Sequence, residues 1–445
     1  MSQIIFILTA LIVIALSVRY YGRIVQNIRL GREIRLKGDV TWRLKQVLLI
    51  GFAQKKMFKN LLPAVFHLFI YIAFLITVTE LIEIFTDGIF GYHRFFASYL
   101  GWFYTFIISS IEFLSVLAFV ATLVFLSRRN VIKIGRFWNP DLKGWPFRDA
   151  NLILLGEIIL ILSIFTMNGA DLVLQGRMPE HYHPAGPFLI SRFFESFFNH
   201  FGTNTLVILE RTGWWGHILV VFGFLLYLPF SKHLHIIFSF VNLYFTPKNQ
   251  RGEMENMPLI TNEVKSMLGL SDPEVIQNAP EQIPDFGAND VTGLTWKNIL
   301  DAYTCTECGR CTAACPPNIT GKLLSPRKIV MSVRDRAEEA GNYVRKQKKQ
   351  SKVKTDIPQT AVNDGKSLFD YISKEEIFAC TTCNACVEAC PVHINPLDVI
   401  LQMRRYEVLT NASGPSDWIT MFTNLENNGS VWQIPAARSA WIQQD

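Results

Sequence analysis

Residues 305–316 read Cys-Thr-Glu-Cys-Gly-Arg-Cys-Thr-Ala-Ala-Cys-Pro, and residues 380–391 read Cys-Thr-Thr-Cys-Asn-Ala-Cys-Val-Glu-Ala-Cys-Pro. Both follow the spacing C-x2-C-x2-C-x3-C-P, which ligates [4Fe–4S] clusters in bacterial ferredoxins. Zinc is the alternative metal, but its structural sites use two cysteine pairs separated by a longer arm. Four cysteines within eleven residues, repeated once, therefore predict two [4Fe–4S] clusters.

The spacing also predicts which thiolates share a cluster. Three thiolates two residues apart wrap one cubane within a tight loop, and the fourth points toward the cubane of the other run. We therefore expect crossed ligation. One cluster takes Cys305, Cys308, Cys311 and Cys390, and the other takes Cys380, Cys383, Cys386 and Cys315.

The eight cysteines also indicate a cellular compartment. All of them lie in the two runs, so none remains for a disulfide. This pattern is typical of metal binding in a reducing compartment and not of a secreted framework. The net charge of +6 is modest, and the basic residues do not form one stripe, so no nucleic-acid partner is expected.

The first 245 residues contain most of the apolar runs. Half of the 445 residues are hydrophobic and only 18% are charged, against about 25% in soluble proteins. A helix needs about 20 apolar residues to span a bilayer. Five stretches satisfy this requirement, and they run over residues 3–18, 61–84, 100–126, 150–168 and 213–243. The first lacks the basic region and cleavage site of a signal peptide, so we expect a helix there.

Lys and Arg residues in the connecting loops predict the orientation. Residues 19–59 carry eleven and residues 127–148 carry six, whereas loop 85–99 has one and loop 169–212 has three, offset by four acids. The N-terminus is therefore expected outside and residues 244–445 inside. This predicts a multi-pass protein of the inner (cytoplasmic) membrane with its iron–sulfur domain in the cytoplasm.

The predicted fold is mainly α-helical, with a five-helix transmembrane bundle followed by a helical ferredoxin domain that holds two [4Fe–4S] clusters. We expect a membrane domain over 1–245, a linker over 246–297, the ferredoxin domain over 298–410 and a partner-docking tail over 411–445. The basic stretch 345–354 is either a solvated loop or a docking patch for an acidic partner or anionic lipid.

The ferredoxin part carries a more specific resemblance. The run from Thr304 to Pro316, followed by Asn318-Ile-Thr-Gly-Lys and Ser325-Pro-Arg-Lys, resembles the cluster-binding subunit of heterodisulfide reductase. It also resembles membrane iron–sulfur proteins that connect electron-transferring flavoprotein with quinone. The resemblance implies a membrane oxidoreductase subunit.

The tail fits the same family through Asn424-Leu-Glu-Asn-Asn-Gly and Arg438-Ser-Ala-Trp. Chains of that family usually continue into cysteine-rich CCG domains, whereas this sequence stops at Asp445. The resemblance therefore implies a partner iron–sulfur subunit that bears the CCG domains. Large apolar residues of the tail are expected to form its docking surface, since such groups mark an interface when exposed. They are Trp418, Phe422, Val431, Trp432, Ile434 and Trp441.

The membrane half resembles the gamma subunit of respiratory nitrate reductase, a five-helix diheme cytochrome b. The resemblance rests on Phe66-His67-Leu68 opening the second helix and on Pro229-Phe-Ser-Lys with His235 closing the fifth. It implies that His67 and His235 bind a heme b on the cytoplasmic side, as two imidazoles can.

For the outer heme, only one of the two ligands of that family has a counterpart in this sequence. His217 corresponds to one of its ligands, eighteen residues before His235, which on one continuous helix is five turns and the same face. Thr77 stands where its partner is expected, and Thr does not ligate heme. The second heme is thus missing, five-coordinate, or ligated from elsewhere. The other outer histidines are His93, His181, His183 and His200. We expect His233 to be interfacial.

Two acids lie deep in predicted helices, Glu112 and Glu157. Ionisable groups inside a membrane are costly and often functional. Each is expected either to pair with a polar neighbour or to deliver protons to a quinone.

Taken together, these features predict an electron-transfer subunit between a cytoplasmic redox partner and the quinone pool. Electron-transferring flavoprotein is the first candidate donor, and a thiol/disulfide or sulfur compound is the second. A structural membrane subunit with stabilising clusters is the alternative from another class. No residue resembles a nucleophile or general base, and no GxGxxG motif is present, so a flavin would lie in a partner.

Overall fold

The computed structural model describes residues 2–248, 253–254, 256–270, 285–350, 362–433 and 442. Within these ranges the fold is entirely helical, without a β-strand; Arg32 and Thr295 form one isolated bridge. Two compact units divide the chain. The first comprises Met1–Gln26, Leu44–Tyr244 and Tyr303–Gly309, and the second comprises Asn27–Arg43, Phe245–Ala302 and Arg310–Asp445.

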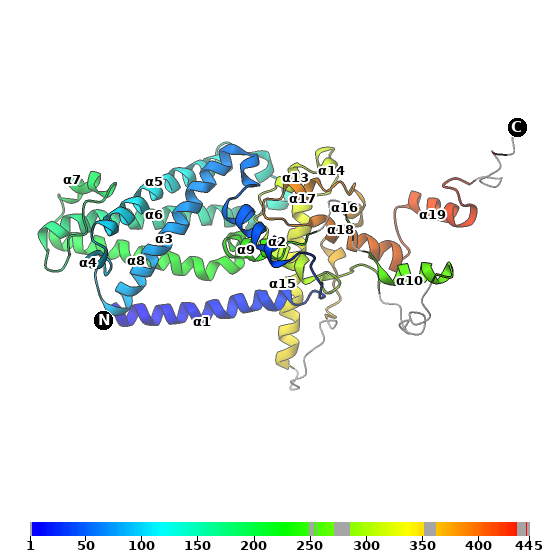
Figure 1. Ribbon diagram of the computed structural model, residues 1–445, viewed down its shortest axis with the longest axis horizontal. Coiled ribbons are helices and arrows are strands. Elements are labelled where there is room, and N and C mark those ends of the chain that lie inside the picture. The colour runs from blue at the N-terminus through cyan, green and yellow to red at the C-terminus, as the bar shows by residue number, and fades with distance from the viewer. Residues whose placement is uncertain are drawn as a thin grey trace. The chain divides into compact units, whose positions relative to one another are not determined.

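Five long helices build the first unit (Figure 1). They are α1 (Ser2–Ile28), α3 (Leu61–Phe90), α5 (Trp102–Asn130), α6 (Trp145–Arg177) and α8 (Thr203–Tyr227). Each is long and apolar enough to cross a membrane, α8 together with the 3-10 turn Leu228–Phe230 that follows it. At 1.5 Å per residue, a helix of 27 residues is about 40 Å long and exceeds the roughly 30 Å hydrocarbon core. The prediction of five apolar helices is confirmed.

Close packing holds the bundle together, chiefly between α6 and α8 and between α3 and α5. At Gly213 an added Cβ would lie 2.6 Å from the backbone nitrogen of Met167, so only glycine permits this approach of α8 to α6. The first helix joins through Phe6, which is 1% exposed and packs its ring against those of Trp214 and Phe222. Aromatic contacts of this kind anchor a helix because each ring buries a large area.

The fifth membrane helix differs from the prediction. It begins at Thr203 instead of residue 213 and ends at Tyr227. Two 3-10 turns, Leu228–Phe230 and Lys232–Leu234, follow, and a separate helix α9 (His235–Tyr244) begins there. Pro229 explains the break, because proline lacks an N–H group and clashes with the preceding turn. The expectation that His217 and His235 share one face of a continuous helix is therefore wrong.

Shorter elements complete the connections of the first unit. They are α2 (Val40–Gln46, whose first four residues belong to the second unit), a π-helical turn Val47–Phe52, the 3-10 turns Met57–Lys59, Gly135–Phe137, Pro140–Leu142 and Ser191–Phe194, and the helices α4 (Ala97–Leu100) and α7 (Glu195–Phe198).

The second unit contains one long helix, α15 (Pro326–Gln350), and many short ones. They are α10 (Pro258–Met267), α12 (Trp296–Thr304), α13 (Arg310–Ala313), α14 (Pro316–Ile319), α16 (Lys374–Phe378), α17 (Ala385–Ala389), α18 (Pro396–Arg405) and α19 (Ser416–Asn428), with 3-10 turns Val291–Gly293 and Leu368–Asp370 and a π-helical turn Tyr406–Thr410. The apolar residues of α15 recur every three or four positions, and this buried face packs against α18.

A buried arginine fastens α15 to its surroundings. The Arg336 side chain is fully buried and donates to both carboxylates of Asp290 and Asp364, at 2.5–2.8 Å. A buried charge requires such pairing because its loss of hydration is otherwise uncompensated. The guanidinium in turn holds the pKa of Asp364 below its ordinary value.

The boundary of the second unit is wider than the sequence suggested. The end of the predicted linker is packed, with Ala288, Val291 and Leu294 at most 1% exposed. Arg32, in the first predicted cytoplasmic loop, accepts a hydrogen bond from the Trp296 N–H and donates one to Leu294. Residues distant in sequence therefore contribute to this unit.

Candidate redox site at the cysteine loops and the membrane histidines

The two cysteine runs fold into loops of the same backbone shape. Glu307 and Thr382, at equivalent positions, have φ of +53° and +54°, and Gly309 and Asn384 have +72° and +60°. In each loop the first cysteine sulfur accepts a hydrogen bond from the N–H two residues later, at 3.4 Å. Positive φ is uncommon for residues other than glycine, so its recurrence reflects the shape that the cysteine spacing imposes.

The thiols of the second run have a neighbour from the first. Cys315 lies within electrostatic range of Cys380 and Cys383, and Cys386 interacts with all three. Burial, reinforced by these neighbours, raises the pKa of the Cys386 thiol to about 12, and burial raises the pKa of Cys315 and Cys380. Metal coordination removes such protons, because it compensates the buried thiolate charge. This grouping is the one that crossed ligation requires.

The donor set distinguishes a cluster from a single metal ion. Among the described residues, no three His, Cys, Asp or Glu side chains are close enough to share one ion. A cubane has a different requirement, because its four thiolates bind four separate irons and do not converge on one point. The donor set and its spacing therefore fit a cluster better than a lone ion.

A cation supports the second loop. Arg404 of α18 donates to the carbonyl oxygens of Ile377 and Phe378, at 2.7 and 3.1 Å, and to that of Cys380. Its guanidinium thus lies beside the first cysteine of the run. Positive charge next to an iron–sulfur cluster favours the reduced form, because the cluster gains negative charge on reduction.

The first loop is instead held by the membrane bundle. Glu307, between Cys305 and Cys308, forms an ion pair with Lys232, and both side chains are at least 90% buried. The Lys232 ammonium also donates to the carbonyl of Pro146 at 2.7 Å, at the start of α6. Nothing in the sequence pairs positions 232 and 307, so sequence reasoning did not find this contact.

Asp149 fixes the turn that presents Lys232. Its carboxylate accepts hydrogen bonds from the Tyr227 and Ser231 hydroxyls and from the Lys232 N–H at 3.0 Å. Because α8 ends at Tyr227, these hydrogen bonds of the buried Asp149 carboxylate hold the turn that follows the membrane helix.

Three histidines gather at the same end of the bundle. His235 and His233 have ring centres 5.8 Å apart, and His233 is also within electrostatic range of His67. The Nδ1 of His67 lies 3.2 Å from the Gln54 side-chain oxygen, and that of His235 lies 2.9 Å from the Lys232 carbonyl. Such acceptors favour a proton on Nδ1 and leave the lone pair on Nε2, the form that ligates heme iron. The hydrogen bonds of both predicted ligands therefore suit heme ligation, and a heme held by His67 and His235 stays a prediction.

His217 lies elsewhere on α8. Its side chain is 4% exposed, it interacts with the backbone of Leu160, and its Nδ1 has no hydrogen-bond partner. The Thr77 hydroxyl bonds to its own helix, at the Phe74 carbonyl. The structure thus places no ligand at Thr77, and a role for His217 in heme binding stays a prediction.

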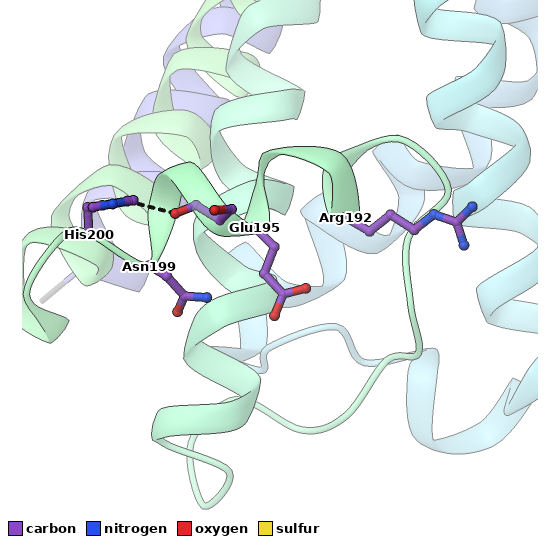
Figure 2. Close-up of a pocket in the computed structure, with 5 residues that line it drawn as sticks. Arg192, Glu195, Asn199 and His200 are labelled. Carbon is purple, nitrogen blue, oxygen red and sulfur yellow. Dashed lines mark hydrogen bonds between the residues drawn. The ribbon is translucent and has the colours of Figure 1, made fainter.

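The remaining outer histidines have other contacts. His93 lies 3.1 Å from Asp171 and packs on Tyr182, and His181 and His183 are exposed. His200 accompanies Arg192, Glu195 and Asn199 in an open hollow at α7, where its Nδ1 lies 2.8 Å from the Ser196 carbonyl. Figure 2 shows that the side chains of this hollow do not converge on a point.

The two deep acids have different surroundings. Glu112 is fully buried and accepts hydrogen bonds from Asn168 at 3.0 Å and from the Ile190 and Ser191 N–H groups. These contacts favour pairing with polar neighbours, the first of the two alternatives. Glu157 is half-buried and has no hydrogen-bond partner in the described part of the chain. A proton-transfer role for it stays a prediction.

Comparisons with known proteins bear on the cysteine loops. Residues 301–394 match the family model of the 4Fe-4S dicluster domain. This segment is a 4Fe-4S dicluster domain. The prediction from the two cysteine runs is thus confirmed at the level of the domain. No solved structure matches the chain.

Three relatives extend the comparison. The chain is 26% identical over 447 residues to the probable iron-sulfur-binding oxidoreductase FadF of Bacillus subtilis, covering 95% of the chain and 59% of that protein. It is 25% identical to the EtfAB:quinone oxidoreductase of Syntrophomonas wolfei, over 93% of the chain and 55% of the relative. A probable membrane-anchored ferredoxin of Chromohalobacter salexigens is 32% identical over 165 residues, which are 35% of the chain and 24% of that protein.

Heterodisulfide reductase subunits of Methanosarcina also match, over 35% and 24% of the chain. The resemblance predicted from the cysteine runs is therefore confirmed, and the chain is related to iron–sulfur oxidoreductases and reductase subunits. It spans somewhat more than half the length of the two relatives that it matches throughout.

Proposed function

We propose that this chain is the membrane electron-transfer subunit of an oxidoreductase that connects a cytoplasmic redox partner with the quinone pool. The observation that carries the proposal is the position of Lys232. Its ammonium pairs with Glu307 in the first cysteine loop, and its carbonyl accepts from His235. One residue therefore links the first cluster loop to a proposed heme ligand at the start of α9.

The cofactors supply one-electron chemistry, and the chain's residues hold and orient them. The first cluster would be held by Cys305, Cys308, Cys311 and Cys390, the second by Cys380, Cys383, Cys386 and Cys315, and one heme b by His67 and His235. Gln54 and the Lys232 carbonyl would orient the two imidazoles. Asp149 would keep the turn at 227–232 rigid between the first loop and the membrane helices.

The proposed orientation places this end of the bundle in the cytoplasm. Arg128, Arg129 and Lys133 at the end of α5 and Lys232 after α8 lie on that side, in agreement with the charge rule for cytoplasmic loops. A reporter fused after Asp445 should be active only in the cytoplasm. Activity on the outer side would reverse the orientation.

The donor is proposed from the relatives and from the exposed tail. One relative is named for EtfAB and quinone, which favours an electron-transferring flavoprotein as the donor and quinone as the acceptor. Heterodisulfide reductase subunits favour the alternative of a thiol/disulfide or sulfur-compound couple.

A second iron–sulfur subunit with CCG domains is proposed to dock on α19. Trp418, Ile419, Phe422 and Leu425 of this helix are 36–45% exposed. Trp418 also packs on Phe378, two residues before Cys380. A partner that covers this apolar surface would therefore lie near the second cluster loop. Ile434 and Trp441, the other predicted docking residues, lie outside the described residues.

One experiment tests the function directly. The purified chain, reduced by dithionite, should have b-type absorption bands that a soluble quinone analogue reoxidises. His67→Ala should lose the bis-imidazole signal and the quinone response and keep both clusters. His181→Ala, at an exposed outer position, is the control. A purely structural subunit would give no quinone response, and an unchanged heme spectrum in His67→Ala would contradict the proposed ligand.

A further inference from the structure

A buried polar cluster lies at the other end of the bundle, where α3 and α6 end and α5 and α8 begin (Figure 1). Its ionisable members come from four helices and one loop. They are Glu80, Glu83, Asp87, His93, Arg94, Glu112, Asp171, Glu210 and Arg211, with the phenols of Tyr104 and Tyr182 in contact. Charged groups at membrane depth are costly, so a cluster of this size needs an explanation.

Arg94 lies at the centre. It is 7% exposed and donates to Asp171 and to Asn168, both at 2.6 Å, and to the Tyr104 oxygen at 3.1 Å. The Tyr104 hydroxyl donates to Glu83 at 2.6 Å. The single positive charge of Arg94 therefore compensates Asp171 directly and Glu83 through the hydroxyl of Tyr104.

Most of the other carboxylates have donors of their own. Asp87 accepts from the Arg94 and Phe95 N–H groups, Glu83 from the Phe96 N–H, and Glu210 from the Arg211 side chain. Both carboxylate oxygens of Glu112 accept hydrogen bonds, from the Asn168 side chain and from the N–H groups of Ile190 and Ser191. These acids hold the loops that close this end of the bundle.

Glu80 differs from all of them. It is 4% exposed, and its Oε2 has no hydrogen-bond partner. It lines a small, largely enclosed cavity of about 20 Å³ together with Asp87, Arg94 and Glu210. A cavity of this size holds about one water molecule. A residue with an unpartnered, buried carboxylate oxygen thus lines a space of about the size of one water molecule.

The cluster contains more acidic than basic side chains. Six carboxylates lie in the cluster, against two arginines and one histidine, so three carboxylates remain in excess even when His93 is protonated. Buried carboxylates without a partner take up a proton because the charged form loses its hydration. No hydrogen bond compensates the Glu80 Oε2, whereas Arg94 already donates to Asp171 and, through the Tyr104 hydroxyl, stabilises Glu83. Glu80 is therefore the group that most easily carries a proton.

We propose that Glu80 is a proton-carrying site that connects the membrane interior with the outer surface. The inference rests on the proposed function and supplies its proton balance: reduction of a quinone to a quinol takes up two electrons and two protons, and oxidation releases them. On quinol oxidation the two protons pass one after the other: each binds the Glu80 Oε2, crosses the water-sized cavity to Asp87 or His93, and leaves where His93 reaches solvent with 15% of its side chain exposed. On quinone reduction both protons take the same path inward. The electrons would be carried by the cofactors that the proposed function assigns to this chain.

Infrared difference spectroscopy of the full-length chain tests the site. A pH titration of the wild type should reveal a protonated-carboxyl band that Glu80→Gln lacks and that Glu80→Asp shifts. Quinone turnover should fall about 100-fold in Glu80→Gln, with an altered solvent deuterium effect and with unchanged clusters and heme. Glu180→Gln, the same change at an exposed outer position, should behave as wild type.

The outcomes distinguish a failure of the proton site from a failure of the proposed electron-transfer function. A wild-type chain that does not react with quinone contradicts the proposed function, whereas the carboxyl band still decides the protonation of Glu80. Normal turnover in Glu80→Gln with the band retained overturns the proton site alone. If Glu80→Gln does not fold, an unshifted band and wild-type turnover in Glu80→Asp overturn it instead.

Discussion

The two cysteine loops have the same backbone and different surroundings. In the first loop the residue after Thr306 is Glu307, which is 4% exposed and paired with Lys232 of the membrane unit. The equivalent Thr382 of the second loop is exposed, as is Cys383, and the carbonyl of Cys380 in this loop accepts a hydrogen bond from Arg404. The repeated spacing therefore determines the shape of a loop, and its neighbours determine its role. We interpret the first loop as the one that faces the membrane and the second as the one that faces a partner.

The largest expected effect tests which cluster the last cysteine of each run ligates. Cys315→Ser should remove the cluster of Cys380, Cys383 and Cys386, and Cys390→Ser should remove the other one. Each change should lower the iron content from about eight to about four atoms per chain. Electron paramagnetic resonance would identify the cluster that remains.

Each variant is the matched control for the other, because both replace the last cysteine of a run. Loss of the first cluster in Cys315→Ser would mean that each run holds its own cube, which would contradict crossed ligation.

A buried arginine tests whether the second loop depends on its own unit. Arg336→Leu leaves Asp290 and Asp364 without their partner and should destabilise that unit by about 3–5 kcal/mol. The second cluster should then be lost on mild heating before the heme bands of the membrane unit change. Arg334→Leu on the same helix, whose side chain reaches solvent, is the control. Simultaneous loss of heme would contradict the independence of the two units.

The exposed tail helix tests the partner side of the comparison. Trp418→Ala with Phe422→Ala removes two exposed rings of α19 and should weaken binding of the iron–sulfur partner by about 2–4 kcal/mol, as expected for aromatic anchors. Clusters and heme should persist. Thr423→Ala, on the same helix, is the matched control. Unaltered affinity in an equilibrium binding assay would locate the partner elsewhere.

Much of this arrangement follows from sequence patterns that act locally. The cysteine spacing predicted the dicluster domain, and apolar runs of sufficient length predicted five helices, because both signals lie within one short segment. The break at Pro229 was also visible in the sequence, and the continuous apolar pattern on either side of it hid the signal.

The contacts that distinguish the two loops were not predictable in this way. Lys232 and Glu307 are 75 residues apart, and Arg94 meets Asp171 across 77. A lone acid or base in one sequence does not reveal its partner, because the pairing is set by how helices pack. One signal for Glu80 was present in the sequence, because it is one of three acids in an otherwise apolar membrane helix. Only the structure separates it from Glu83, since Glu83 accepts hydrogen bonds and the buried Glu80 Oε2 has no donor.

The smallest expected effect sharpens the comparison most directly, because it alters the charges beside the first loop and leaves those beside the second unchanged. Glu307→Gln removes a negative charge beside the first cluster and leaves the Lys232 ammonium buried, so the reduction potential of that cluster should rise by some tens of millivolts. Lys232→Met should lower it by a similar amount. The double variant should return close to the wild-type value, since both charges of the pair are then gone. Thr382→Val, the equivalent position in the second loop, should leave both potentials unchanged. Redox titration followed by electron paramagnetic resonance distinguishes the two clusters. A shift of the second cluster in Glu307→Gln, or equal shifts of both, would contradict the assignment of this ion pair to the membrane-facing loop.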